Sequence, residues 1–304
     1  MNNPKVSVLM SVYNGDKYLK ESIISILNQT LANFKFVIIN DASTDNSLDI
    51  IKNFSDPRIK LINNSQNIGL TKSLNIGLKE CQGKYIARID TDDLALPNRL
   101  QVQYDFMEAN PNIALCGSNS ELINENGEII GQKKKVTNPL HIKFKIIFTN
   151  PFLHPSLFFR KDIIKQYNEE FLYAQDYELT SRLIQNHFLT NIPETLIKYR
   201  VSNNSITENK NSRQIQLSNA LKISTTNANY YLNLSLFQVK DIIDIINNKK
   251  INLFPFLKAL KNYKKITSVF ISKENLNKEQ SSQILSIYKS DRNQAFKNFF
   301  KSLI

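Results

Sequence analysis

Cysteine is scarce in this sequence of 304 residues, and its two cysteines, Cys81 and Cys116, match no metal-binding spacing. They support neither a disulfide framework nor a zinc site, so a reducing setting is expected. Uncharged apolar runs of the ~20 residues that a membrane span needs are also missing. The start, MNNPKVSVLM, has no basic segment followed by a long apolar one, so no export signal is predicted. We therefore expect a cytoplasmic protein without an integral membrane segment.

Glycine-rich phosphate loops are absent too. The turn after the first apolar run, SVYNGDKYL, has one glycine, and neither G-x-G-x-x-G nor G-x-x-x-x-G-K-[ST] occurs in the sequence. These patterns form the backbone cradles of dinucleotide and P-loop sites. A phosphate ligand would therefore have to be held in another way.

Positive charge is present in excess, and it is unevenly placed. The net charge is +12, and residues 211–304, with 15 basic and five acidic side chains, contribute +10 of it. Such asymmetry favours two regions with different tasks. The polar stretch VSNNSITENKNSR, residues 201–213, separates them. The predicted domains are residues 1–210 and a basic region of residues 211–304.

Apolar runs and helical patterns alternate along the first region. Apolar, β-branched runs at residues 5–12, 34–41, 59–64 and 84–93 predict strands, and residues 16–31 and 70–81 have helical apolar spacing. This alternation is typical of an α/β fold with a mainly parallel sheet and helices on both faces. Ligands bind at the carboxyl ends of the strands in such sheets.

Polar clusters follow three of these predicted strands. They are Ser11–Asn14, Asn40–Ser43 and Asp90–Asp93, so all three are expected at one edge of the sheet. The last cluster is the most demanding, because carboxylates this close repel one another unless a positive group neutralises them. Arg88, inside the preceding strand, is expected to pair with a nearby carboxylate.

A divalent cation is a second candidate partner for the acidic cluster. Carboxylate oxygens suit Mg or Mn, which one or two carboxylates commonly share with substrate phosphates. In an extended chain Asp90 and Asp92 point to one side and Asp93 to the other, so all three could bind one ion only if the strand has already ended in a turn. The alternative is an acidic loop that caps a helix beginning near Pro97.

The ordered set of these segments resembles the inverting glycosyltransferases of family 2, which have the GT-A fold. The resemblance extends over roughly Lys5 to Thr207 and rests on order and spacing more than on any single segment. Its carriers are VSVLMSVYNGDKYLKESIISILNQT, INDASTDNS, NIGLTKSLNIGLKECQGKYIARIDTDDLALPNRL and LYAQDYELTSRL. The resemblance implies a GT-A nucleotide-diphosphosugar transferase domain over residues 1–210.

The resemblance also implies roles for residues at the nucleotide side. Ser11, Tyr13 and Asp41 would hold the base of the donor, with Asp41 accepting a hydrogen bond from a uracil N–H. Lys72 is a candidate contact of the diphosphate, although a solvated helix lysine is the simpler interpretation. Asp41 could equally be a turn residue that follows a strand.

The resemblance also implies which residues bind the metal and act on the reacting atoms. Asp90 and Asp92 are similar to the family's D-x-D motif, which contacts the ribose and the metal, and Asp93 is a further ligand candidate. The expected metal ligands are Asp92 and Asp93, with Mn or Mg as cofactor. Asp176 is similar to the acidic residue that the family uses as general base, and its alternative is a solvated helix residue.

Some positions depart from the family pattern. Asn40 stands where the family often has an aspartate, Gln175 replaces the usual glutamate before the base, and Ser202 stands where a histidine is common. A histidine contact to metal or phosphate is therefore not expected at Ser202. His154, together with Gln175, is a weaker candidate on the acceptor side, and a packed structural histidine is the alternative for His154.

The basic region contains three segments with helical apolar spacing and interspersed lysines, beginning near Ser235, Leu253 and Ser281. A helical bundle with a solvated lysine face is one interpretation. Peripheral contact with an anionic membrane, at the inner face of the cytoplasmic membrane, is another. Nucleic acid is disfavoured, because no nucleic-acid motif accompanies the lysines.

Two functions follow from the sequence. The first is metal-dependent, inverting transfer of a sugar from a UDP-sugar to a hydroxyl of a glycan or lipid-linked acceptor, in bacterial surface polysaccharide synthesis. The second is a catalytically impaired GT-A domain that serves as a nucleotide-sugar-binding scaffold through its basic tail. Homo-oligomer formation is compatible with both.

Overall fold

A computed structural model of the protein describes residues 3–202 and 210–301. The chain forms two compact units, of which the first comprises Met1–Thr137 and Phe152–Arg213. The second comprises Asn138–Pro151 and Gln214–Ile304. The segment Asn138–Pro151 thus belongs to the C-terminal unit, a division that the charge distribution along the sequence did not indicate.

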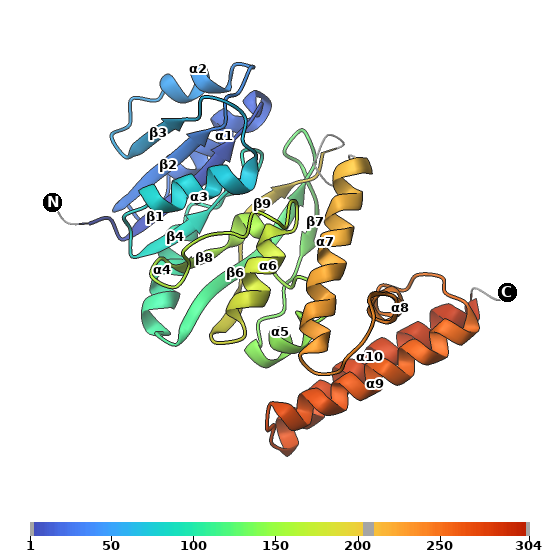
Figure 1. The fold of residues 1–304 in the computed structure, drawn as a ribbon. Coiled ribbons are helices and arrows are strands. Elements are labelled where there is room, and N and C mark those ends of the chain that lie inside the picture. The colour runs from blue at the N-terminus through green and yellow to red at the C-terminus, as the bar shows by residue number, and fades with distance from the viewer. Residues whose placement is uncertain (1–2, 203–209, 302–304) are drawn as a thin grey trace. The chain divides into compact units, whose positions relative to one another are not determined.

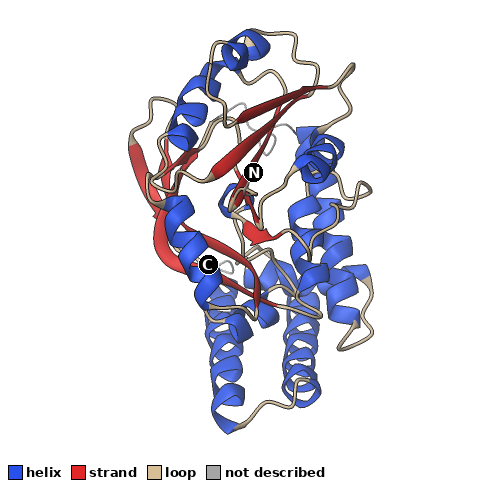
Figure 2. Ribbon diagram, turned by 90° about the vertical axis from the view of Figure 1, so that its left-hand side faces the viewer, coloured by secondary structure: helices blue, strands red, loops and turns tan. Residues whose placement is uncertain are grey.

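All strands among the described residues belong to the first unit (Figure 2) and form one nine-stranded sheet. The strands are β1 (Val6–Val12), β2 (Phe34–Asn40), β3 (Ile59–Asn63), β4 (Tyr85–Arg88), β5 (Leu94–Ala95), β6 (Ile113–Ile123), β7 (Ile129–Lys133), β8 (Phe158–Arg160) and β9 (Phe188–Arg200). Their order is β3-β2-β1-β4-β8-β6-β9-β5, and β7 pairs with β6.

The parallel half of the sheet, β3-β2-β1-β4, confirms the strands predicted from the apolar runs. Val12 at the end of β1 lies opposite Asn40 at the end of β2, and Leu9 lies opposite Arg88 at the end of β4. The other half is mixed: β8 is antiparallel to both β4 and β6, whereas β9 runs parallel to β6. The register brings the carboxyl ends of β1 and β2 together at one edge.

Helices of the first unit cover both faces of the parallel strands (Figure 1). They are α1 (Asp16–Leu27), α2 (Ser47–Lys52), α3 (Leu70–Glu80), α4 (Arg99–Ala109), the 3-10 turn η1 (His154–Ser156) and α6 (Gln175–Leu183). Alternate residues of β1, such as Val8 and Met10, share a buried cluster with α1 and α4. On the other face α3 approaches closely, since a Cβ on Gly77 would lie 2.2 Å from Leu9 Cδ1.

The described part of the second unit is helical. It contains α5 (Pro139–Lys145), most of α7 (Lys210–Asn229), α8 (Leu236–Ile246), α9 (Leu253–Lys273) and α10 (Lys278–Lys301). Local signals set some helix starts: Asn138 accepts hydrogen bonds from the backbone N–H groups of Leu140 and His141, and Ser235 forms a capping box with Gln238. The predicted basic helical region is confirmed as helical where it is described.

An aromatic core holds the second unit together. Phe144 of α5 stacks on Tyr263 of α9 at 6.1 Å between ring centroids, and Tyr263 meets Tyr288 of α10 edge-on at 5.2 Å. These rings belong to one buried cluster that extends to α8. Within the described residues, no helix has the length and apolar character needed to cross a membrane.

Candidate active site

The loops that follow β1 and β2 are linked to each other by hydrogen bonds. The backbone N–H of Asn14 donates to Ser43 Oγ at 3.1 Å, and Asn14 Oδ1 accepts from the backbone N–H of Thr44 at 2.8 Å. Asn14 and Ala42 both have positive φ angles, 48° and 55°. Such a conformation is uncommon for residues other than glycine and tends to mark functional loops.

Asp41 is buried and anchors the loop before α3. Its Oδ1 accepts from Asn64 Nδ2 at 2.7 Å and from the backbone N–H of Ile68 at 3.0 Å, and its Oδ2 accepts from the N–H of Gly69 at 2.8 Å. Gly69 has a φ of 88°, which explains why a glycine precedes α3. A carboxylate has about four lone-pair sites, and these hydrogen bonds from the described residues use three of them on Asp41.

The other predicted nucleotide-side residues lie on the same loops and on α3. Ser11 is buried near the end of β1, and Tyr13, just beyond that strand, is exposed. Lys72 is an exposed residue in the first turn of α3, three residues after Gly69. The structure therefore brings the predicted base-binding residues Ser11, Tyr13 and Asp41 to one sheet edge.

Arg88 forms an ion pair with Asp90, as expected from the sequence. The arginine is buried at the end of β4, whereas the Asp90 side chain is partly exposed. Buried Arg99, at the start of α4, donates from Nη2 to the carbonyl oxygen of Arg88 at 2.7 Å. Within residues 3–202 and 210–301, Nε and Nη2 of Arg88 have no hydrogen-bond partner. A buried guanidinium thus faces the acidic cluster with donors to spare.

Asp92 and Asp93 have different surroundings. Asp92 is partly exposed, and burial together with the neighbouring Asp90 raises its pKa to about 6. Asp93 is fully buried, and burial, then Asp92 and Asp90, raise its pKa well above the usual value. The chain has already left β4 and turns at residues 91–92, so the condition of an extended chain, under which alternation would separate Asp93 from Asp90 and Asp92, is not met.

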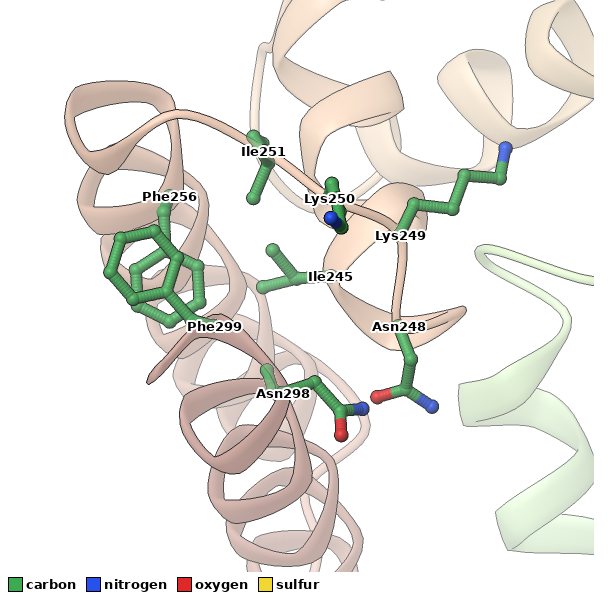
Figure 3. A pocket seen from close by; sticks show the side chains of 9 residues that line it. Ile245, Asn248, Lys249, Lys250, Ile251, Phe256, Asn298 and Phe299 are labelled. Carbon is green, nitrogen blue, oxygen red and sulfur yellow. The ribbon is translucent and has the colours of Figure 1, made fainter. Parts of the chain in front are cut away.

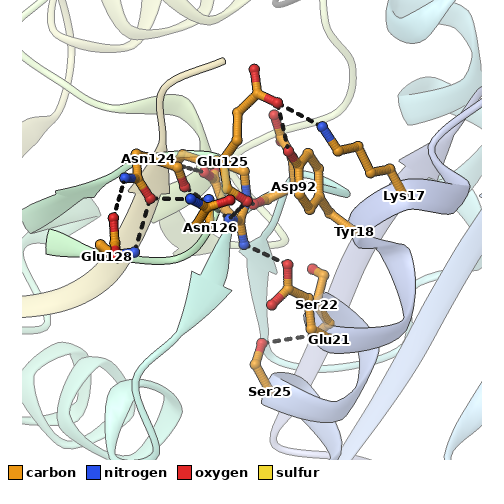
Figure 4. A network of polar contacts seen from close by, with 12 residues as sticks. Lys17, Tyr18, Glu21, Ser22, Ser25, Asp92, Asn124, Glu125, Asn126 and Glu128 are labelled. Carbon is orange, nitrogen blue, oxygen red and sulfur yellow. Dashed lines mark hydrogen bonds and ion pairs between the residues drawn. The ribbon is translucent and has the colours of Figure 1, made fainter.

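Arg200, the last residue of β9, is another buried arginine, and it contacts residues 90–93, which we call the acidic loop. Figure 4 labels its partners Glu21, Asp92, Asn124 and Glu125. Its backbone N–H donates to Asp93 Oδ1 at 2.8 Å, and its Nε donates to the carbonyl oxygen of Asp92 at 2.9 Å. Nη1 reaches the carbonyls of residues 124 and 125, and Nη2 pairs with Glu21 of α1. One side chain therefore ties together α1, the acidic loop and the turn between β6 and β7.

The acidic loop has the donor set that a divalent cation needs. Asp90 and Asp92 offer hard carboxylate oxygens that are accessible in part, and Mg or Mn requires only one or two carboxylates beside substrate phosphate. Asp93 Oδ2 is buried without a hydrogen-bond partner in the described part of the chain. Among those residues, no group of three or more His, Cys, Asp or Glu side chains forms a complete cage. The residues fit an ion shared with a diphosphate.

Asp176 lies in the first turn of α6. Burial raises the pKa of this carboxyl, the backbone N–H groups of Tyr177 and Asp176 oppose the rise, and the charges of Arg88 and Asp90 act on it as well. It is therefore within electrostatic reach of the acidic cluster although 86 positions separate it from Asp90. A carboxyl with a raised pKa beside a charged cluster is typical of acid–base sites.

His154 and Gln175, the two weaker candidates, are both held inside the first unit. His154 Nε2 lies 3.1 Å from the hydroxyl oxygen of Tyr167, and burial, with Arg88 nearby, lowers its pKa well below the usual value. Burial thus favours the neutral form of His154. Gln175 is buried, and its Oε1 has no hydrogen-bond partner in the parts of the chain described.

The sequence did not draw attention to two basic residues of this region. Arg200 was unremarkable because its partners are remote in sequence, such as Asp93 at a separation of 107 positions. Lys135 donates from Nζ to the carbonyl oxygen of Phe152 at 3.1 Å, and burial lowers its pKa to about 8, with Lys133 also lowering it and Asp176 raising it. Only its position in a run of three lysines could have drawn notice.

The sequence that forms this site matches the profile of a known protein family. The sequence profile described as "Glycosyl transferase family 2" matches residues 7–168. The chain belongs to glycosyl transferase family 2. The match extends from β1 to β8. It therefore includes the loops that carry Asp41 and the acidic cluster.

Two similar proteins align with more of this chain than the family profile does. A Haemophilus influenzae protein described as an uncharacterized glycosyltransferase is 38% identical over 255 residues, 79% of this chain and 78% of its own length. The Escherichia coli protein WfgD, described as a UDP-Glc:alpha-D-GlcNAc-diphosphoundecaprenol beta-1,3-glucosyltransferase, is 32% identical over 213 residues, 69% of this chain and 82% of its own length.

A solved structure agrees in fold with this family 2 chain. Residues 1–349 of Staphylococcus aureus TarS, in complex with UDP, match with a TM-score of 0.61 at 18% identity, covering 96% of this chain and 89% of that one. At this identity the likeness concerns the fold alone. The fold is of the GT-A type with a C-terminal helical region, as the sequence predicted.

Proposed function

We propose that the protein transfers a sugar from a UDP-sugar, with inversion and with a divalent cation, to a hydroxyl group of a glycan or lipid-linked acceptor. The observation that supports it most is the grouping of Asp41, the acidic loop and Asp176 in one unit, with the raised pKa of Asp176. The proposed biological setting is bacterial surface polysaccharide synthesis. The names of relatives such as WfgD support both donor and acceptor class.

The donor base is proposed to bind where the loops after β1 and β2 meet. Within the described residues, Asp41 has one acceptor site left after its three hydrogen bonds, which suits a single ring N–H such as that of uracil. Exposed Tyr13 offers an aromatic face beside it. Because Asp41 is already fixed by the loop before α3, its carboxylate needs no reorganisation when a base arrives.

The diphosphate is proposed to lie over the acidic loop. Asp92, with Asp90 or Asp93, would hold a Mn or Mg ion there, and that ion would supply positive charge to the departing diphosphate. Arg88 neutralises Asp90. Arg200 holds the other two aspartates, because it donates hydrogen bonds to the carbonyl oxygen of Asp92 and to the carboxylate of Asp93. The protein thus keeps three repelling carboxylates together before any ligand binds.

Asp176 is proposed as the general base. It takes the proton of the acceptor hydroxyl while the oxygen forms a bond to the anomeric carbon, and the bond from that carbon to the diphosphate oxygen breaks with its electron pair. Attack from the face opposite the leaving group inverts the anomeric centre. A UDP-sugar with an α linkage should therefore yield a β-linked product, which proton NMR of the product distinguishes.

Binding of UDP tests the donor half of this proposal. Calorimetry should show UDP binding that requires Mn, with chelation abolishing the signal. Asp92→Asn should weaken Mn-dependent binding by on the order of 10- to 100-fold, because one anionic ligand of the ion is lost and each ~1.4 kcal/mol is tenfold. Asp105→Asn, an exposed aspartate of α4 that pairs with Gln101, is the matched control and should bind normally. Equal UDP binding with and without metal would refute the metal site.

A further inference from the structure

Large apolar side chains are exposed where α9 begins and α10 ends. Leu253, Phe254 and Leu257 of α9 and Phe300 of α10 are 57%, 77%, 52% and 59% exposed. They belong to the same end of the unit, since Phe256 and Phe299, next to them in sequence, stack with ring centroids 4.3 Å apart. We call these four residues the apolar end. Grouped exposure of this kind marks an interaction surface more often than chance.

A small cavity lies beside the apolar end, but the cavity does not explain why these four side chains are exposed. Residues of α8, α9, α10 and the α8–α9 connection line a space of about 20 Å³ (Figure 3). Ile245, Phe256 and Phe299 are among the side chains that line it, and its volume is enough for about one water molecule. This cavity is therefore too small to make the exposed side chains the rim of a small-molecule site.

Lysines continue the exposed face of α9 beyond the apolar end. The helix has five lysines and no acidic residue. Four of the lysines, all exposed, follow Leu257 at helical spacing: Lys258, Lys261, Lys264 and Lys265. The ion pairs in the described part of the second unit use other lysines, namely Lys143, Lys240 and Lys249. Among the described residues of this unit these four lysines form no ion pair, although the charge of Lys258 opposes the rise that burial causes in the pKa of the Asp241 carboxyl.

The apolar side chains and the row of lysines complement the two layers of an anionic membrane surface, namely its acyl chains and its anionic headgroups. Phenylalanine and leucine gain by entering the region between headgroups and acyl chains, while lysines remain at the level of the anionic headgroups. A second copy docking through the same face would bring the two lysine rows together, which repulsion disfavours. Charge complementarity therefore selects anionic lipid over self-association.

We propose that the apolar end and the four lysines of α9 dock this protein on an anionic membrane surface. The four apolar side chains enter the interface, and the lysines set the preference for anionic lipid. All eight residues belong to the second unit and none is a proposed ligand of the donor, so docking can be tested separately from donor binding.

The lack of tryptophan in the natural chain allows a direct test. Phe254→Trp in the full-length protein introduces a single tryptophan at the apolar end. Its emission should shift to shorter wavelength with vesicles that contain phosphatidylglycerol, and brominated lipid should quench it. Phe188→Trp, at another exposed position (59%) in β9 of the first unit, should show neither change. An emission of Phe254→Trp that vesicles leave unchanged would overturn the proposal.

A charge variant tests the lipid preference. Changing Lys258, Lys261, Lys264 and Lys265 to Gln should lower partitioning onto anionic vesicles at least tenfold, because each lysine near such a surface contributes roughly fivefold. The control changes four exposed lysines of the first unit, Lys20, Lys52, Lys79 and Lys165, to Gln and should retain binding. Circular dichroism verifies that both variants are folded.

Three other outcomes would also reject the proposal. One is equal binding of the natural protein to neutral and anionic vesicles. Another is an equal loss in the two lysine variants, which would mean that net charge alone drives binding. The third is a blue shift of Phe254→Trp without lipid that grows with protein concentration, which would identify a second copy of the chain as the occupant.

Discussion

Asp176→Asn is expected to lower sugar transfer by about 10²- to 10⁴-fold, the usual contribution of a general base. The amide has nearly the same shape as the carboxylate but cannot accept the hydroxyl proton. Because the proposed donor contacts lie on other loops, UDP binding in the presence of Mn should stay within about twofold of the natural protein, a difference of ~0.4 kcal/mol. Initial transfer rates and calorimetry on the same preparation separate these two effects.

Glu178→Gln is the matched control for this variant. Glu178 lies in the same first turn of α6, carries the same charge and pairs with Arg182 four residues later. If loss of negative charge at the start of α6 were the cause, both variants would lose transfer equally. A fully active Asp176→Asn protein would remove Asp176 from the mechanism while leaving the binding of UDP unaffected.

The pH dependence of transfer gives a second test of the same residue. Asp176 acts as a base only when it is ionised, and burial raises its pKa. Activity is therefore expected to fall as the pH is lowered through this raised pKa, which places the acidic limb of the profile above the usual range for an aspartate. The residual activity of Asp176→Asn should lack that limb, whereas Glu178→Gln should keep it.

Arg200→Met is expected to destabilise the first unit by about 3–5 kcal/mol, because the carbonyl oxygens of the acidic loop and of the β6–β7 turn lose the buried guanidinium that donates to them. The side chain makes four hydrogen bonds to the carbonyls of Asp92, Asn124 and Glu125 and to Glu21. Stabilities of whole proteins are only ~5–15 kcal/mol, so a loss of this size is large. Urea denaturation monitored by circular dichroism measures it, and Mn-dependent UDP binding should weaken in parallel.

Arg182→Met provides the comparison for Arg200→Met. Arg182 is about half exposed and pairs with Glu178 on the same helix, and pairs of this kind contribute ~0–1 kcal/mol. Arg200→Lys should recover little of the loss, since one ammonium group cannot reach partners on three sides as a guanidinium does. Equal stability of the Arg200→Met and Arg182→Met proteins would show that Arg200 does not hold the acidic loop.

The parts of the fold that sequence predicted are those encoded by local pattern. The sequences of the four parallel strands and of helices α1 and α3 contain periodic apolar runs, so these elements could be predicted from the sequence alone. The mixed half of the sheet could not, because the pairing of β8 with both β4 and β6 joins remote segments. Similarly, the segment Asn138–Pro151 carries no compositional mark of its membership in the second unit.

The site shows the same division between local and remote information. The pairing of Arg88 with Asp90 was accessible, because the two residues lie two positions apart. Strand alternation did not explain why Asp93 is the buried member of the cluster, because β4 ends at Arg88 and the chain turns at residues 91–92. Arg200 was not, since its role depends on contacts with residues 21, 92, 93 and 124–125 that only the folded chain brings together. The roles of Asp41 and Asp176 stay predictions.

The position of Arg200 has a consequence for exchanging parts between relatives. The family profile ends at residue 168, but the cation that holds the acidic loop lies 32 residues later, on a strand that runs parallel to β6. A chimera joined at residue 168 would take the acidic loop from one parent and the arginine that hydrogen-bonds to it from the other. Hybrid enzymes built from this chain should instead be joined beyond β9, so that the donor half keeps its own arginine.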